Sequence, residues 1–161
     1  MRLQEECQEN LRWRMTTTFQ PYLRAEALSP RRTILLVEDE PFVREATRGI
    51  LQSAGFEVLP ASDAPQALRV YKECQQKIDL VMTDMMLPGG TGQELGRDLR
   101  QCCPELAVLV TSGYPNPEYE TEAPESCTYF LAKPYSKRTL CEKIEKILGA
   151  TTRARVATQA S

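Results

Sequence analysis

The most informative absence in this chain is histidine, which does not occur in any of its 161 residues. Without histidine, the chain can supply neither a histidine-ligated metal site nor a hydrolytic site in which histidine activates serine or cysteine. It also cannot carry a phosphohistidine of its own. Any imidazole that takes part in its chemistry must come from a partner molecule.

Paired cysteines and long apolar runs are also absent. The C-x-x-C spacing of zinc and thiol redox sites does not occur among Cys7, Cys74, Cys102, Cys103, Cys127 and Cys141. Free, reduced thiols are therefore expected. The first twenty residues contain no apolar signal core, and no run of about 18 apolar residues follows. We expect a cytoplasmic protein without a membrane segment.

Charge is unevenly divided along the chain. Residues 1–32 contain six basic and four acidic residues, whereas residues 33–149 contain 12 basic and 18 acidic residues. Nucleic-acid binding requires a positive surface that neutralises phosphates. An acidic central region does not provide one, so we expect no nucleic-acid partner.

Short apolar runs alternate with amphipathic segments from Thr33 onward. The runs predict buried strands at 34–37, 58–59, 80–82, 107–110 and 129–132. The residues that begin or end the intervening helices are Pro41 and Gly55, Asp63, the capping-box pair Thr91 and Glu94, and Ser136 with Gly149. This alternation predicts an α/β fold, a doubly wound five-stranded parallel sheet with helices on both faces.

The same pattern predicts the boundaries of the folded part. We expect a leader at 1–31 that is mostly disordered or partly helical, a domain at 32–149, and a disordered tail at 150–161. Three prolines in segment 114–126 predict a short or distorted fourth helix there.

Polar residues follow four of the predicted strands. Glu38 and Asp39 follow the first strand, Asp84 the third, Thr111 the fourth and Lys133 the fifth. The carboxyl ends of parallel strands meet at one edge of a sheet, where ligands bind. Three carboxylates that lie close together repel one another, and a hard cation such as Mg²⁺, which shares its coordination with phosphate oxygens, would stabilise them.

Each of these residues also has a structural explanation when taken alone. Glu38 and Asp39 could complement a helix dipole, Asp84 could cap a turn, and Thr111 and Lys133 could be ordinary strand-end residues. The combination of all four strand ends favours a metal and phosphoryl site over these separate explanations.

Four segments resemble the receiver domains of response regulators, over about residues 32 to 149. The segments are Ile34-Leu35-Leu36-Val37-Glu38-Asp39-Glu40, Leu80-Val81-Met82-Thr83-Asp84 with Pro88-Gly89 downstream, Val110-Thr111-Ser112-Gly113, and Lys133-Pro134. The resemblance implies a flavodoxin-like sheet with strand order 2-1-3-4-5. It also implies a cis peptide bond before Pro134.

The resemblance assigns a role to each site residue. Asp84 would be the phosphoacceptor, and Thr111 and Lys133 would hold the phosphoryl oxygens. Phe130 matches the family's aromatic switch, although a plain core aromatic would fit the same position. The residues that would bind Mg²⁺ are Asp39, Asp84 and the backbone carbonyl of Met86, with Glu38 assisting through water.

A receiver would take its phosphoryl group from a sensor histidine kinase or a phosphotransfer protein and signal by contact with a downstream protein. It would promote only its own phosphorylation and dephosphorylation, with no small-molecule substrate beyond phosphodonors. Residues 17–23 resemble the closing strand of histidine-kinase ATPase domains, and this similarity suggests derivation from the C-terminal receiver of a hybrid kinase. The alternative explanation for that segment is an unstructured or partly helical leader.

Two other functions fit parts of the same pattern. The first is a receiver-like adaptor that acts without phosphorylation. The second is a metal-dependent phosphohydrolase with Asp84 as nucleophile, but Met86 stands where that class usually carries a second acid.

Overall fold

The computed structural model describes residues 31–74, 77–114 and 127–159, with side chains described as far as Thr151. The strands are β1 (Thr33–Val37), β2 (Glu57–Ala61), β3 (Leu80–Asp84), β4 (Met86–Leu87), β5 (Gly90–Thr91), β6 (Ala107–Ser112) and β7 (Thr128–Ala132). The helices are α2 (Pro41–Ser53), α3 (Ala64–Glu73), α4 (Gly92–Arg100) and α5 (Lys137–Gln159).

Five of the strands form one parallel sheet in the order β2-β1-β3-β6-β7. Numbered within the sheet, this is the predicted order 2-1-3-4-5, so the predicted fold is confirmed. β1 and β3 are adjacent at its centre, and β1 is completely buried because helices cover both faces of the sheet. All five carboxyl ends point to the same edge.

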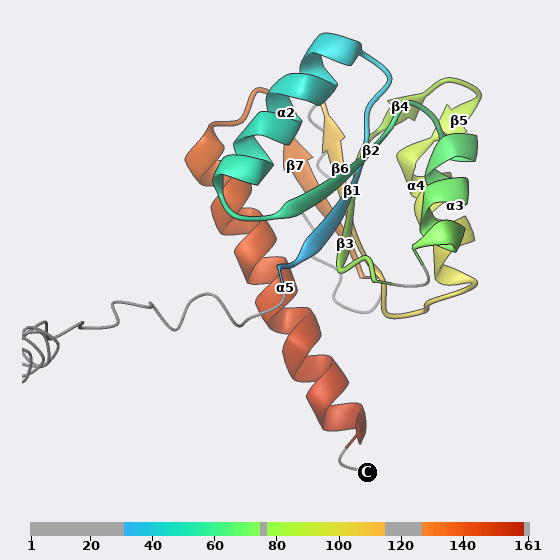
Figure 1. Cartoon of the computed structure of the whole chain (residues 1–161), viewed down its shortest axis with the longest axis vertical. Helices are drawn as coiled ribbons and strands as arrows, with labels where there is room; N and C mark the ends of the chain where they lie inside the picture. Colours follow the sequence, from blue (N-terminus) through green and yellow to red (C-terminus); the bar gives the residue numbers. More distant parts are fainter. Residues whose placement is uncertain (1–30, 75–76, 115–126, 160–161) are drawn as a thin grey trace, which may run out of the picture. The chain divides into compact units, whose positions relative to one another are not determined.

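Helices α3 and α4 lie on one side of the sheet and α2 and α5 on the other (Figure 1), and each face has its own apolar core. Leu35 and Val81 point to the face covered by α3 and α4. Their neighbours Ile34 and Leu80 point to the opposite face, which α2 and α5 cover. Alternate residues of one strand therefore anchor helices on opposite sides of the sheet.

The predicted helix starts are confirmed by their contacts. Asp63 accepts a hydrogen bond from the backbone nitrogen of Gln66 at 2.7 Å, and Ser136 accepts one from Thr139 at 3.0 Å. Thr91 and Glu94 form both bonds of a capping box at the start of α4. These side chains satisfy amide groups that the first turn of a helix leaves unpaired.

The predicted end of the last helix at Gly149 is wrong. α5 continues from Lys137 to Gln159, so the segment 150–159 is helical and not part of a disordered tail. Glycine weakens a helix interior by about 1 kcal/mol, but it ends a helix only where the chain then turns. The next residues, Ala150-Thr151-Thr152-Arg153-Ala154-Arg155, contain no proline or second glycine to make that turn.

The structure adds a small element that the sequence pattern did not predict. β4 and β5 form a two-stranded antiparallel ribbon in which Leu87 pairs with Gly90. Gly89, at the tip, has a φ of 82°, a left-handed conformation that favours glycine. The ribbon lies between the end of β3 and the start of α4.

Two predicted segments lie outside the described residues: most of the leader at 1–31, which includes the kinase-like segment 17–23, and most of the predicted fourth helix at 114–126. Within the described ranges, none of the helices has the length and apolar character that a bilayer span requires.

Candidate functional site

The carboxyl ends of four strands bring the predicted polar residues together. Glu38 and Asp39 directly follow β1, and Asp84 is the last residue of β3. Thr111 lies opposite Asp84 in the register between β3 and β6. Lys133 follows β7, and its backbone nitrogen donates to the carbonyl oxygen of Ser112 at 2.7 Å. The spatial grouping that the sequence predicted is therefore present.

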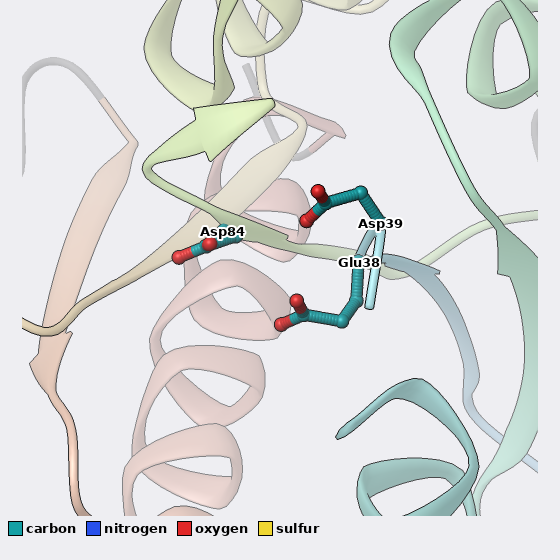
Figure 2. Close-up of side chains that lie close together, drawn as sticks. All are labelled: Glu38, Asp39 and Asp84. Carbon is teal, nitrogen blue, oxygen red and sulfur yellow. The ribbon is translucent and has the colours of Figure 1, made fainter. Parts of the chain in front are cut away.

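Three carboxylates form a compact cluster at this edge (Figure 2). One oxygen from each of Glu38, Asp39 and Asp84 lies within 4.8 Å of the others. Glu38 is buried, Asp84 is partly buried, and Asp39 is exposed to solvent. At such separations, like charges repel strongly unless a cation lies nearby.

Lys133 provides positive charge to this cluster. Its Nζ lies 3.0 Å from Oε2 of Glu38 and 3.3 Å from Oδ1 of Asp84. Burial of the ammonium favours a lower pKa, but the hydrogen bonds and attraction to Glu38 and Asp84 outweigh it. The pKa of Lys133 is therefore raised above its ordinary value. The Lys133–Pro134 peptide bond is cis, as the resemblance implied.

Thr111 lies on β6 opposite Asp84, and Phe130 lies on the neighbouring strand β7, where it pairs with Val110. The hydroxyl of Thr111 is buried and donates to the carbonyl oxygen of Thr83 at 3.3 Å. Phe130 is partly buried and packs against the core that underlies α3 and α4. The roles that the resemblance assigned to these two residues remain predictions.

The segment after Asp84 is held close to the sheet. The backbone nitrogen of Met85 donates both to Oδ1 of Asp84, at 2.9 Å, and to the carbonyl oxygen of Thr111, at 2.8 Å. The backbone nitrogen of Gly92 donates to the carbonyl oxygen of Met85 at 3.0 Å. Met86, whose carbonyl was predicted to bind the metal, begins β4 and is 64% exposed.

One residue that contacts the site was not predicted from the sequence. Arg44, in the first turns of α2, donates from Nη1 to the carbonyl oxygens of Glu38, at 2.6 Å, and Asp39, at 3.2 Å. The one indication of this contact in the sequence is that Arg44 follows Asp39 by five residues and Glu38 by six. A basic residue at that spacing is common on exposed helices, so sequence alone does not distinguish it.

The donor set fits a hard divalent cation. All three clustered side chains offer carboxylate oxygens, the ligands that Mg²⁺ and Ca²⁺ prefer, and no nitrogen or sulfur ligand stands among them. Asp39 is exposed and Asp84 is partly exposed, so water and a phosphoryl group, which Mg²⁺ commonly takes as its other ligands, can reach the cluster.

Comparisons with known proteins found a matching family model and similar proteins. A family model described as the response regulator receiver domain matches residues 34–145. The sensor kinase CckA of Brucella abortus is 33% identical over 126 residues, which are 78% of this chain and 13% of that protein. The chain spans 53% or less of the length of the next curated relatives.

Solved structures show the same relationship. The receiver domain of the hybrid histidine kinase CckA is 35% identical with a TM-score of 0.61, over 72% of this chain and 98% of that one. The response regulator TrrA of Thermotoga maritima, solved in complex with Mg(2+)-BeF, is 27% identical with a TM-score of 0.60, over the same shares of the two chains.

Proposed function

The chain belongs to the response regulator receiver domain family, and on this premise we propose that it accepts a phosphoryl group on Asp84 in a two-component phosphorelay. The observation that carries the proposal is the contact of 3.3 Å between Oδ1 of Asp84 and Nζ of Lys133, beside two further carboxylates. A carboxylate that lies between an ammonium and a cation site can approach the negative oxygens of a phosphoryl group.

As is typical of receivers, the proposed phosphodonor is a phosphohistidine of a sensor kinase or a phosphotransfer protein, and this chain contains no histidine that could take its place. A carboxylate oxygen of Asp84 attacks the phosphorus as the bond from phosphorus to the donor's imidazole nitrogen breaks. The electron pair of that bond stays on the nitrogen, which takes up a proton. The product on this chain is an acyl phosphate.

The surrounding side chains neutralise and bind the transferred group. The ammonium of Lys133 turns from Glu38 toward a phosphoryl oxygen, and the hydroxyl of Thr111 leaves the carbonyl of Thr83 to donate to another. Asp39, Asp84 and the backbone carbonyl of Met86 would hold Mg²⁺, and Glu38 would assist through water. Bound Mg²⁺ offsets the negative charge of the phosphoryl oxygens.

The output is a change in a protein-binding surface. Movement of Thr111 frees space beside β7, into which the ring of Phe130 turns, and this shifts the balance between two conformations of the adjoining surface. The proposed receiver spans residues 32–149. A downstream protein that prefers the phosphorylated conformation would read the signal.

Labelling from a small phosphodonor tests the assignment. Incubation with acetyl phosphate and Mg²⁺ should add the mass of one phosphoryl group to the intact chain, and chelation of Mg²⁺ should prevent it. Asp84→Asn should abolish the addition, because an amide is a poor nucleophile. Asp98→Asn, an exposed acid on α4, is the matched control and should label normally.

Two results would contradict the proposal. One is undiminished labelling of Asp84→Asn. The other is a wild-type protein that neither labels nor changes its amide spectrum around Asp84 and Thr111 when beryllofluoride and Mg²⁺ are added. The second result would favour an adaptor that acts without phosphorylation.

A further inference from the structure

Arg44 joins the acidic loop to the helix that follows it. Its Nη1 donates to the last backbone carbonyls before the helix cap, at 2.6 Å from the oxygen of Glu38 and 3.2 Å from that of Asp39. Its own backbone nitrogen donates to the carbonyl oxygen of Glu40 at 2.9 Å, within the first turn of α2. One side chain therefore fixes two consecutive peptide groups against a regular helix.

The two acidic residues depend on Arg44 to different degrees. Glu38 is also held by its backbone nitrogen, which donates to the carbonyl oxygen of Ala61 at 3.1 Å, and by the ion pair with Lys133. Asp39 is exposed, and the contact with Arg44 ties its peptide group to α2. Asp39 is thus the member of the cluster whose position Arg44 controls most directly.

We propose that Arg44 is a positioning residue for the cation site. This inference rests on the proposed function, because it assigns Arg44 a part in Mg²⁺ binding by Asp39 and Asp84. Without the guanidinium, mutual repulsion among the carboxylates would push the loop of Glu38 and Asp39 away from Asp84. Arg44 holds that loop in place before the metal arrives, so the metal does not have to order it.

Charge repulsion alone predicts the opposite effect of removing Arg44. Whether the affinity for Mg²⁺ rises or falls therefore decides between the two explanations. A guanidinium close to a cation site repels the cation, and its removal on charge grounds alone would strengthen Mg²⁺ binding. Removal of a positioning contact weakens it. Loss of a residue that orients a metal ligand typically lowers metal affinity by about tenfold or more. We expect the positioning effect to prevail.

The experiment is a Mg²⁺ titration of the full chain, followed by the amide signal of Met85, whose nitrogen donates to Oδ1 of Asp84. Arg44→Met removes the donors and the charge, and the dissociation constant for Mg²⁺ should rise by about tenfold. Arg48→Met is the matched control. Arg48 lies one turn further along α2, where its Nη1 forms an ion pair with Glu45 at 3.5 Å.

The control removes the same charge from the same helix without touching the loop. The Nε of Arg48 is buried and has no hydrogen-bond partner among the described residues, so its removal breaks no hydrogen bond of that atom. Its dissociation constant should stay equal to that of the wild type or fall slightly. Arg44→Gln keeps a hydrogen-bond donor but no charge. Its dissociation constant for Mg²⁺ should lie between those of the wild type and Arg44→Met.

Each outcome separates the inference from the proposed function. Mg²⁺ binding by Arg44→Met or by Arg44→Gln that is as tight as in the wild type, or tighter, would overturn the role of Arg44 alone. A thermal midpoint lowered in chelator, with an unchanged dissociation constant, would also overturn it, because a merely structural role predicts that result. If the wild type itself showed no response to Mg²⁺, the proposed function would fail as well.

Discussion

At the scale of single residues, the site keeps charges close together that would be more stable apart. Glu38, Asp39 and Asp84 have oxygens within 4.8 Å of one another, and Lys133 contacts two of the three. Such an arrangement costs stability in the absence of a cation and provides a place for one. Removal of the Asp39 carboxylate, for which no ion pair with Lys133 is present among the described residues, should therefore stabilise the fold and weaken metal binding.

Asp39→Asn tests this trade-off, because Asp39 is exposed and its amide replacement remains solvated. In chelator, the free energy of unfolding should rise by about 0.5 to 1 kcal/mol as repulsion is relieved. At a Mg²⁺ concentration about ten times the dissociation constant, the wild type should gain about 1.4 kcal/mol and the variant less. Urea denaturation under both conditions measures the two values.

Glu45→Gln is the control for this comparison. Glu45 is an exposed acid on α2 that lies 3.5 Å from Arg48 and outside the cluster. Its replacement should change stability by less than about 0.5 kcal/mol, equally with and without Mg²⁺. If Asp39→Asn were less stable than the wild type in chelator, repulsion among the carboxylates would not destabilise the fold.

The residues of this cluster could be predicted from sequence because their position depends on topology alone. Glu38, Asp39, Asp84 and Lys133 each follow an apolar run, and the carboxyl ends of parallel strands share one edge. Arg44 could not be predicted in the same way, since its contacts depend on the direction of one long side chain across a turn. Sequence pattern specifies which face of an element a residue occupies but not which carbonyl it reaches.

At the scale of elements, two glycines that both lie in helices have different structural roles. Gly92 begins α4 directly behind Asp84, and a Cβ atom there would overlap the backbone oxygen of Asp84 and lie 2.6 Å from Cγ2 of Thr83. Gly149 lies inside α5 and is exposed, and a Cβ atom added to it would meet no other atom within 4 Å. The close approach of α4 to β3 requires glycine at position 92, whereas no close approach requires it at position 149.

Substitution by alanine should therefore have opposite effects at the two positions. Gly92→Ala should lower the free energy of unfolding by about 1 to 3 kcal/mol, because α4 must move away from β3. Gly149→Ala should raise it by about 0.5 to 1 kcal/mol, because alanine loses less entropy in a helix. Urea denaturation of both variants beside the wild type measures this difference.

A stable Gly92→Ala would mean that α4 can retreat from β3 at little cost. Gly149→Ala that lowers stability would indicate that α5 turns at this glycine, as the sequence pattern predicted. That pattern failed at Gly149 because a glycine marks a helix end only with a turn or a breaker after it. The capping box of Thr91 and Glu94 was predictable because both of its bonds are local.

At the scale of the whole domain, one sheet supports two separate cores. Ile34 and Leu35 are consecutive residues of β1, both with no exposed surface, yet they belong to the cores on opposite faces. β1 pairs with both β2 and β3 and contributes residues to both cores. If these strands separate, both cores are disrupted together. The cation site depends on the same strands, because β1 and β3 hold its carboxylates.

This arrangement predicts that the two faces unfold together. Ile34→Ala and Leu35→Ala should each lower the free energy of unfolding by about 2 to 5 kcal/mol, the usual cost of truncating a buried aliphatic side chain. Val43→Ala on α2, at a residue that is 37% exposed, should lower the free energy of unfolding by less than about 1 kcal/mol and serves as the control.

Hydrogen exchange in increasing urea can follow each helix separately. If the sheet links the faces, Leu35→Ala should lower the midpoint of protection of α2 and α5 as much as that of α3 and α4, although Leu35 contacts only the core beneath the second pair. Ile34→Ala should likewise affect all four helices. Loss of protection confined to the helices on the substituted face would refute the linkage, since it would mean that one layer can open while the strands that hold the carboxylates stay paired.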